Sequence, residues 1–313
     1  MNYYELLPEK NTFSNIVIDL THRCNMECSN CYIPNRNIPD LNKELLYVFL
    51  KKLPFRTYIR LIGAEPTMRD DIFEIISEVK KLGHRPSLTT NGLKLAHLTY
   101  VENLKKAGLR LLLHSMNGAD DDKIYKILDN GNWANVKVRA LENILKCRLP
   151  INTGTIIAKG INEQTISKQI NLFVNTAIKL GINFDKTLPY KRITPVLRMK
   201  SVGPIGRHMG EHFSYSITEL ASLASEQLEI PLENILKNKA ASGVVKAGYY
   251  SESQTSLLFP YKSKAGTIFI RFIDWSVNDE GVIDHDNKNR GRLTQNWTVA
   301  PFFEHIKINE FEY

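Results

Sequence analysis

The short segment CNMECSNC constrains this chain more than any other feature, because it places three cysteines, Cys24, Cys28 and Cys31, within one loop. Cysteine thiolates are the usual protein ligands of iron–sulfur clusters, and a cubane cluster normally takes four of them. A loop with three thiolates therefore predicts a cluster with one iron left open for a substrate or a cofactor.

Two other uses of these cysteines are open at this point. A structural zinc site has four nitrogen or sulfur ligands, and His22 could supply the fourth, although zinc motifs usually draw their ligands from two separated pairs. Disulfides are disfavoured, because the chain has only 4 cysteines in 313 residues and begins with no charged-then-apolar leader. The sequence thus predicts a cytoplasmic protein with reduced thiols.

The composition is that of an ordinary globular protein, with 43% hydrophobic and 24% charged residues. A chain of 313 residues can bury one large core or two smaller ones. No apolar run approaches the roughly 18 to 20 residues that a membrane-spanning helix needs, so no membrane anchor is expected.

The formal net charge of +8 favours an acidic partner, since a positive field raises the local concentration of anions. Nucleic acid, an acidic leader peptide and a phosphorylated metabolite would all benefit from this field. Basic residues concentrate at residues 191–200 and 287–292, and neither run interleaves aromatic residues as a platform for single strands would. A solvated basic face is an equally good interpretation of both runs.

The first two hundred residues alternate short apolar runs with amphipathic stretches, a pattern typical of repeated βα units and a parallel sheet. The sequence predicts an α/β fold with six such units, the first strand running directly into the cysteine loop. The expected strands are residues 15–21, 57–63, 86–92, 110–115, 151–157 and 182–188. We place a boundary after Tyr190, with a barrel core at residues 1–190 and a C-terminal α+β extension at residues 191–313.

The extension is predicted to contain two helices broken by Pro231, with Ser216 and Thr218 as candidate N-caps. A strand is expected at residues 266–277, and a helix or tail at residues 300–313. His285 lies in a polar segment between them, where a surface position is the more common role for a single histidine.

Four motifs together resemble the radical S-adenosylmethionine superfamily, whose signature is CxxxCxxC after the first strand of a partial TIM barrel. The segment LIGAEPT at residues 61–67 resembles the family's GGEP segment, with Ala64 in place of the second glycine. LTTNG at residues 88–92 and LLLHSMNG at residues 111–118 resemble its third-strand and fourth-strand segments. The resemblance predicts a partial (βα)6 TIM-type barrel.

The resemblance also implies roles for individual residues. Cys24, Cys28 and Cys31 would hold a [4Fe-4S] cluster, Glu65 would orient the methionine end of S-adenosylmethionine, and Ser115 would face its ribose. The remaining candidates for contact with this cofactor are Tyr32, Gly63, Ala64, Thr90, Asn91, Asn117, Ile156 and Lys159.

Some positions depart from the family pattern. Asn30 stands before the last cysteine where the family often has an aromatic residue, so Tyr32 is the alternative contact for adenine. Lys159 is a candidate partner of the methionine carboxylate, and a solvated lysine at a strand end is an equally good interpretation. No cysteine follows Cys147, which predicts a single cluster and makes Cys147 a core thiol.

The resemblance implies an enzyme that cleaves S-adenosylmethionine reductively and abstracts a hydrogen atom from its substrate. We expect the substrate to be a ribosomally made precursor peptide with an acidic leader, and the modification to resemble that of the peptide spliceases, which excise tyramine and leave a β-amino acid. The expected partners are a separate small leader-recognition protein and a reductant such as flavodoxin or ferredoxin. The alternatives are a small-molecule dehydrogenase or isomerase acting on a sugar or nucleotide precursor, and an RNA-modifying enzyme.

Overall fold

In the computed structural model, which describes residues 4–33, 35–203, 206–207, 209–237, 256–274 and 290–301, helices and strands alternate along most of the chain. The first five strands are β1 (Asn15–Asp19), β2 (Tyr58–Ile62), β3 (Arg85–Thr90), β4 (Leu111–Ser115) and β5 (Ile151–Ile157). The helices between them are α1 (Lys43–Lys52), α2 (Ile72–Lys81), α3 (Leu98–Ala107), α4 (Asp122–Leu128) and α5 (Ala134–Lys146). The elements that follow are α6 (Thr165–Lys179), β6 (Val196–Ser201), α7 (Ile217–Leu228), α8 (Leu232–Leu236), β7 (Ser256–Ser263), β8 (Gly266–Ile273), β9 (Arg290–Leu293) and β10 (Val299–Pro301).

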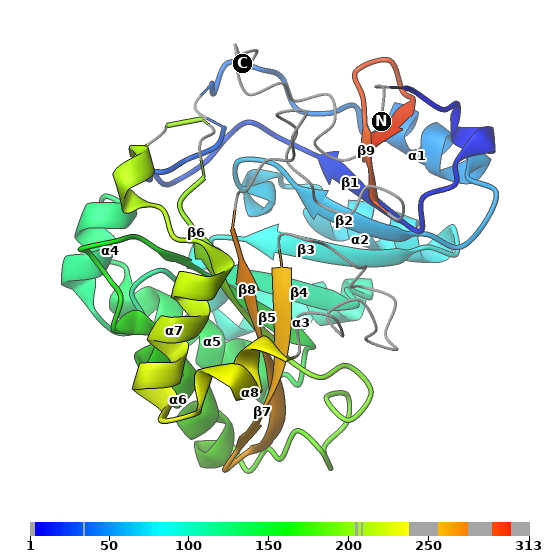
Figure 1. Cartoon of the computed structure of the whole chain (residues 1–313). Coiled ribbons are helices and arrows are strands. Elements are labelled where there is room, and N and C mark those ends of the chain that lie inside the picture. Colours follow the sequence, from blue (N-terminus) through cyan, green and yellow to red (C-terminus); the bar gives the residue numbers. More distant parts are fainter. Residues whose placement is uncertain are drawn as a thin grey trace.

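One sheet contains all these strands, in the order β10-β9-β1-β2-β3-β4-β5-β6-β8-β7 (Figure 1). Every pairing from β9 through β8 is parallel, and only β10 and β7 at the two ends are antiparallel. The strands β1 to β6 follow the predicted barrel order, so the predicted α/β barrel is confirmed. Parallel strands joined by helices bring all their carboxyl ends to one edge of the sheet.

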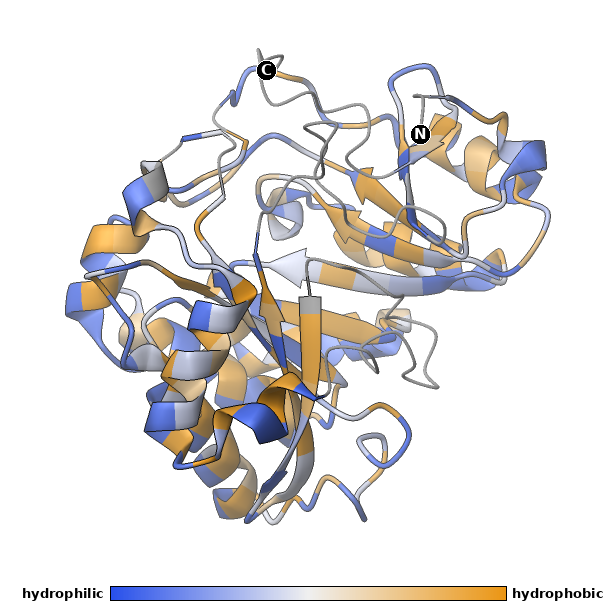
Figure 2. Cartoon of the chain, viewed as in Figure 1, coloured by the Kyte–Doolittle hydropathy of each residue, from blue (hydrophilic) through white to orange (hydrophobic). Residues whose placement is uncertain are grey.

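The core lies between the sheet and its helices. Side chains alternate between the two faces of a strand, and in β1, β6 and β8 the residues that pack into the main apolar cluster occupy every second position. Ile16 and Ile18 of β1, Leu197 and Met199 of β6, and Ile270 of β8 belong to one buried apolar cluster. The strands carry both hydrophobic and hydrophilic residues in Figure 2. The residues between the apolar ones therefore face the interior of the curved sheet.

The sixth strand was predicted at the wrong place. Residues 182–188 form turns, in which the Thr187 amide donates to the Asn183 carbonyl at 2.7 Å. Phe184 is buried against Phe173 of α6. The apolar residues whose spacing suggested a strand are therefore apolar because they pack on the helices beneath the sheet. The true strand β6 follows residue 190, and the sheet is extended by β8 next to β6 and by β9 next to β1. The division of the chain into two domains at residue 190 stays a prediction.

Other expectations for the C-terminal part were met more closely. Ser216 caps α7 and forms a capping box with Glu219, whereas Thr218 lies inside the helix. Pro231 separates α7 from α8, and the strand expected at residues 266–277 is β8. The strand β7, which forms a hairpin with β8, was not predicted. His285 and residues 302–313 lie outside the described residues. Among the described helices, none has the length and apolar character to cross a bilayer.

Candidate functional site

The predicted motifs meet at the carboxyl ends of the first four strands. The cysteine loop follows β1, the segment Gly63–Glu65 follows β2, Asn91 follows β3, and Ser115 ends β4. The parallel register holds these ends next to one another, since Asp19 pairs with Ile62 and Thr90 pairs with His114. The structure therefore brings together motifs that are separated by up to ninety residues along the chain.

All three loop cysteines are free and half-buried. The loop is fixed by backbone contacts, because the Cys31 amide donates to the Cys28 carbonyl at 3.3 Å and the Ser29 amide donates to the Leu128 carbonyl at 2.9 Å. In the part of the chain that the structure describes, no group of three His, Cys, Asp or Glu side chains is arranged to hold a metal ion. Burial raises the pKa of the Cys24 and Cys28 thiols.

A close backbone contact joins the cysteine loop to the segment after β2. Gly63 has a φ of +138°, and a β-carbon on it would lie 2.3 Å from the Thr21 carbonyl oxygen, so no other residue fits there without a shift. The next two amides bond to the loop, Ala64 to the Thr21 carbonyl at 2.8 Å and Glu65 to the Arg23 carbonyl at 2.9 Å. Gly63, the first glycine of the GGEP-like segment, thus permits the close approach of this segment to the Thr21 carbonyl. The methyl group of Ala64 is tolerated at the next position.

The Glu65 carboxylate is fully buried and ties the loops after β2 and β3 together. Its Oε1 accepts from the Thr67 amide at 3.0 Å, the Thr67 hydroxyl at 2.6 Å and the Thr90 hydroxyl at 2.7 Å. Its Oε2 accepts from the Asn91 amide at 2.6 Å. With this many donors the carboxylate is held rigidly, as a group that must orient a ligand should be.

Asn91 extends this network to the cysteines. Its side-chain amide donates to Asn25 Oδ1 at 2.8 Å and lies 3.9 Å from Cys24 Sγ. A cation contacts the last cysteine of the loop, where Arg36 Nη2 is 3.3 Å from Cys31 Sγ. Arg36 Nε and Nη1 are buried and have no hydrogen-bond partner among the described residues. Sequence reasoning missed Asn25, which occupies a variable position between the first two cysteines of the motif, and Arg36, which lies beyond the motif.

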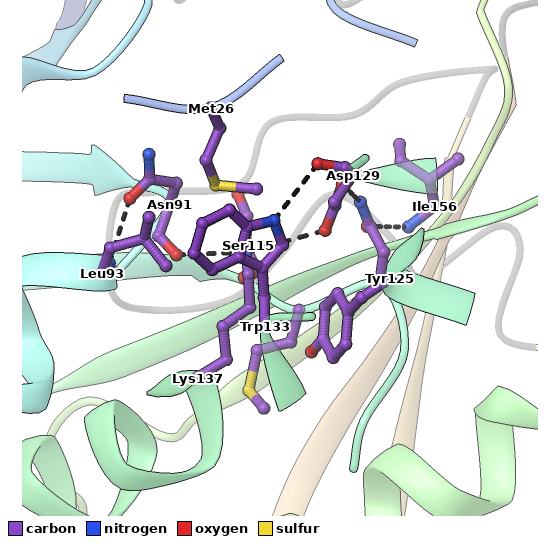
Figure 3. Close-up of polar contacts among 12 residues, drawn as sticks. Met26, Asn91, Leu93, Ser115, Tyr125, Asp129, Trp133, Lys137 and Ile156 are labelled. Carbon is purple, nitrogen blue, oxygen red and sulfur yellow. Dashed lines mark hydrogen bonds and ion pairs between the residues drawn. The ribbon is translucent and has the colours of Figure 1, made fainter. Parts of the chain in front are cut away.

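A buried polar network lies beneath Ser115 (Figure 3). Lys137 of α5 is 1% exposed, and its Nζ donates to the backbone carbonyls of Asn91 at 3.1 Å and Ser115 at 2.9 Å. The same Nζ lies 3.8 Å from Asp129 Oδ2. Asp129 Oδ1 accepts from Asn117 Nδ2 at 2.8 Å, whereas no described residue donates a hydrogen bond to its buried Oδ2. Lys137 thus fixes the ends of β3 and β4 from below.

The residues expected to face the nucleoside differ in whether their side chains already form hydrogen bonds within the protein. The Asn117 side chain bridges Asp129 and the Ile156 amide, so its role here is to hold the ends of β4 and β5 together. The Ser115 hydroxyl forms no hydrogen bond with any described residue, and the side chain is half-buried. Ile156 is also half-buried on β5, whose Gly154 pairs with Ser115. Ser115 and Ile156 therefore remain available to a ligand.

Two candidate residues do not join the others. Lys159 Nζ pairs with Glu219 of α7 at 3.0 Å and lies over the Tyr215 ring, with its side chain 47% exposed, which matches the interpretation as a solvated lysine. Tyr32 has its hydroxyl close to Asp19 and Arg292, and burial beside Asp19 raises its pKa. These partners belong to β1 and β9, on the side of the barrel away from Ser115 and Ile156. The contact between Tyr32 and adenine stays a prediction.

Cys147 and the two basic runs also have clear positions. Cys147 caps the end of α5 and packs at the edge of the core, far in the sequence from the loop cysteines. Lys191 and Arg192 are exposed, but Arg198 of the same run is buried within β6, so this run is not a uniform solvated face. Only residues 290–292 of the second run are described, and they form part of β9.

The chain is similar to known proteins in sequence and in fold. Residues 18–173 match the model of the Radical SAM superfamily, which covers all four motifs. A 7,8-dihydro-6-hydroxymethylpterin dimethyltransferase of Methanocaldococcus jannaschii is 28% identical over 198 residues, which cover 56% of this chain and 39% of that protein. A GTP 3',8-cyclase of Marinobacter nauticus is 30% identical over 195 residues, which cover 58% of this chain and 56% of that protein. The chain spans about half the length of these relatives.

Solved structures show the same fold. Streptococcus suis SuiB bound to precursor peptide SuiA has a TM-score of 0.53 at 16% identity, covering 70% of this chain and 46% of that one. The protein anSMEcpe with bound AdoMet and Kp18Cys peptide has a TM-score of 0.51 at 17% identity, covering 71% of this chain and 61% of that one.

Proposed function

Because this chain belongs to the radical SAM superfamily, we propose that it is an enzyme that abstracts a hydrogen atom from its substrate. The family implies a [4Fe-4S] cluster and S-adenosylmethionine, which together supply an electron and a carbon-centred radical when bound. The observation that carries the proposal is the link between Glu65 and Cys24 through Asn91, with contacts of 2.6 and 3.9 Å. This link joins three separate motifs into one site.

The residues present fit both groups. Three free thiols in one loop supply cluster ligands, and the Arg36 guanidinium beside Cys31 offers positive charge to a thiolate. Arg36 carries two buried nitrogens that have no hydrogen-bond partner among the described residues, so the site retains polar groups that a bound molecule would satisfy.

We assign roles to this chain's residues on that basis. Cys24, Cys28 and Cys31 hold the cluster, and the Glu65 network with Thr90 and Asn91 fixes the loops that receive the methionine end of the cofactor. The Ser115 hydroxyl binds a ribose hydroxyl, and Ile156 packs on the adenine. Gly63 and Ala64 shape the backbone contact beside them. Asn117 acts by positioning, because its side chain is already bonded on both sides.

The test is anaerobic reconstitution with iron and sulfide, followed by reduction with S-adenosylmethionine present and measurement of 5′-deoxyadenosine. We expect the wild-type protein and Cys147→Ala to release this product, and Cys24→Ala to release none. Cys147→Ala is the matched control, since Cys147 lies outside the cysteine loop. Equal product from Cys24→Ala, or zinc bound in place of iron, would contradict the proposal.

For the substrate, two proposals have different support. The first is a precursor peptide, with tyramine excision as the finer form, and it is supported by the fold that this chain shares with SuiB and anSMEcpe. It includes an acidic leader, a small recognition protein and a flavodoxin or ferredoxin as reductant. The second is a small anionic molecule, supported by the names of the relatives, which act on GTP or on a pterin. The two proposals are distinguished by adding a candidate peptide or a candidate small anion to the reconstituted protein. Mass spectrometry then shows which of the two is modified.

A further inference from the structure

Arg36 offers more hydrogen-bond donors beside the cysteine loop than the described residues satisfy. Its Nη2 donates to Cys31 Sγ at 3.3 Å. Its Nε and Nη1 are buried, and no described residue accepts a hydrogen bond from either of them. Buried donors in proteins normally have partners, because an unsatisfied donor is costly. This guanidinium is therefore suited to contact a group that the protein chain itself does not provide.

The segment that carries Arg36 is held by contacts that do not involve its side chain. On one side, the Asn35 carbonyl oxygen lies 3.1 Å from His22 Nδ1. On the other side, the Leu41 amide donates to the Leu20 carbonyl at 3.0 Å. The fold thus presents the guanidinium to the cysteine loop without using it to hold the segment together.

The two carboxylates of residues 20–41 are paired with other cations. Asp40 pairs with Arg23 at 2.6 Å, and Glu27 pairs with Arg207 at 2.7 Å. No described carboxylate forms an ion pair with Arg36. Because charges interact more strongly where water is excluded, the positive charge of Arg36 acts mainly on the thiolate that it contacts.

We propose that Arg36 sets the reduction potential of the [4Fe-4S] cluster held by Cys24, Cys28 and Cys31. Its Nη2 donates to the Cys31 thiolate, and its Nε and Nη1 supply donors for the sulfides of the cluster. The proposal deepens the function proposed above and rests on it. Arg36 is a positioning residue in this role, since it acts on the cluster through a ligand and through charge.

The physical basis is the change of charge on reduction. An external one-electron donor is oxidised, the cluster gains that electron, and Arg36 keeps its proton, because a guanidinium is not deprotonated in proteins. Hydrogen bonds to the sulfurs and nearby charge are among the features that set the potential of such clusters. A cation with several N–H donors stabilises the more negative, reduced form, so Arg36 raises the potential.

The test measures the midpoint potential of the reconstituted protein without S-adenosylmethionine, by titration with dithionite and detection of the reduced form by electron paramagnetic resonance. We expect Arg36→Met to lower the equilibrium constant for reduction roughly tenfold, which is about 59 mV for one electron. Arg36→Lys keeps the charge but loses the planar set of donors, so it should give a smaller shift in the same direction. Arg23→Met is the matched control and should shift the potential much less, because Arg23 is 47% exposed and paired with Asp40.

A second measurement separates this role from a structural one. In the protein without a cluster, Arg36→Met removes a cation that has no described counter-ion, and thermal melts should show no loss of stability. If Arg36 instead held its segment in place, Arg36→Met would lower the melting temperature of the protein with and without the cluster. That result, together with an unchanged potential, would overturn the proposal.

Two other outcomes would also overturn it. One is an equal shift of the potential in Arg23→Met and Arg36→Met. The other is weaker binding of S-adenosylmethionine by Arg36→Met at an unchanged potential, which would assign the guanidinium to the carboxylate of the cofactor. A wild-type protein that forms no iron–sulfur cluster would contradict the proposed function itself. A cluster with the wild-type potential in Arg36→Met would contradict only the role of Arg36.

Discussion

The Lys137 ammonium lies 3.8 Å from Asp129 Oδ2, and the two side chains are only 1% and 2% exposed. Such a pair is costly to bury, and removal of one partner leaves the other charge uncompensated. Here the ammonium also holds two backbone carbonyls at the ends of β3 and β4. The pair therefore connects the stability of the barrel to the geometry of the candidate cofactor site.

Lys137→Met should lower the free energy of unfolding by about 3 kcal/mol or more, because it leaves Asp129 buried without its cation. The measurement is urea denaturation followed by circular dichroism. Lys126→Met on the exposed face of α4 is the control and should have little effect. If Lys137→Met and the double variant Lys137→Met/Asp129→Asn were equally destabilised, the charge pair would not be the cause.

Glu65→Gln should weaken binding of S-adenosylmethionine roughly tenfold and destabilise the protein by about 1–3 kcal/mol. An amide nitrogen in place of one carboxylate oxygen turns an acceptor into a donor that faces the Thr67 or Asn91 amide. Binding can be measured by equilibrium dialysis with labelled cofactor on the reconstituted protein.

Glu74→Gln provides the comparison for Glu65→Gln, since this surface carboxylate pairs with Lys43 and Tyr47 of α1, away from the candidate site. Unchanged binding in both variants would remove Glu65 from the cofactor site and leave it a structural role alone.

The sequence motifs meet in the structure because they lie at strand ends whose positions follow from the order of the strands, and the assignment of single residues to the cofactor stays a prediction. They did not predict Asp129 or Lys137, which come from a loop and a helix without a motif. One signal was present: Lys137 falls on the same helical face as Ala140, Leu141 and Ile144, where a charged residue is unusual. A lysine on an apolar face indicates a buried partner.

The C-terminal half was harder to predict for two physical reasons. Residues 182–188 carry apolar residues at strand-like spacing, yet Ile182 and Phe184 are buried below the sheet, and their backbone is committed to turns. The basic run at residues 191–200 looked like a solvated surface, yet Arg198 belongs to a strand with one polar face. The polar face of β6 lies inside the protein only because the sheet curves around it. The periodicity of hydrophobic residues in the sequence does not predict that curvature.

Gly63→Ala and Ala64→Gly form a matched pair that tests the contact between the cysteine loop and β2. Gly63→Ala should destabilise the protein by about 2 kcal/mol or more, because its φ is +138° and the new methyl group would meet the Thr21 carbonyl oxygen at 2.3 Å. Ala64→Gly should cost no more than about 1 kcal/mol, the usual effect of added chain entropy. Thermal melts compare the stability of the two variants. A larger loss of stability in Ala64→Gly than in Gly63→Ala would contradict the assigned contact.

His114 should make the protein less stable as the pH falls from about 6.5 toward 3. Its imidazole is fully buried, and burial, assisted by Lys137, lowers its pKa from 6.5 to about 3. Above pH 6.5 the ring is neutral in both states and contributes no pH dependence. Below this value the unfolded chain takes up a proton that the folded ring refuses, which costs about 1.4 kcal/mol per pH unit.

At pH 5 the loss from His114 should thus reach about 2 kcal/mol, and His84, whose pKa is also lowered by burial, acts in the same direction. The direct check is the NMR shift of the His114 ring protons, which should not titrate between pH 7.5 and 5 in the folded protein. A midpoint near the ordinary histidine value would show that the ring is solvated. In the structure the His114 ring packs directly beneath Gly92, because a β-carbon on Gly92 would lie 2.1 Å from His114 Cε1. A solvated ring would therefore no longer support the turn that carries Asn91.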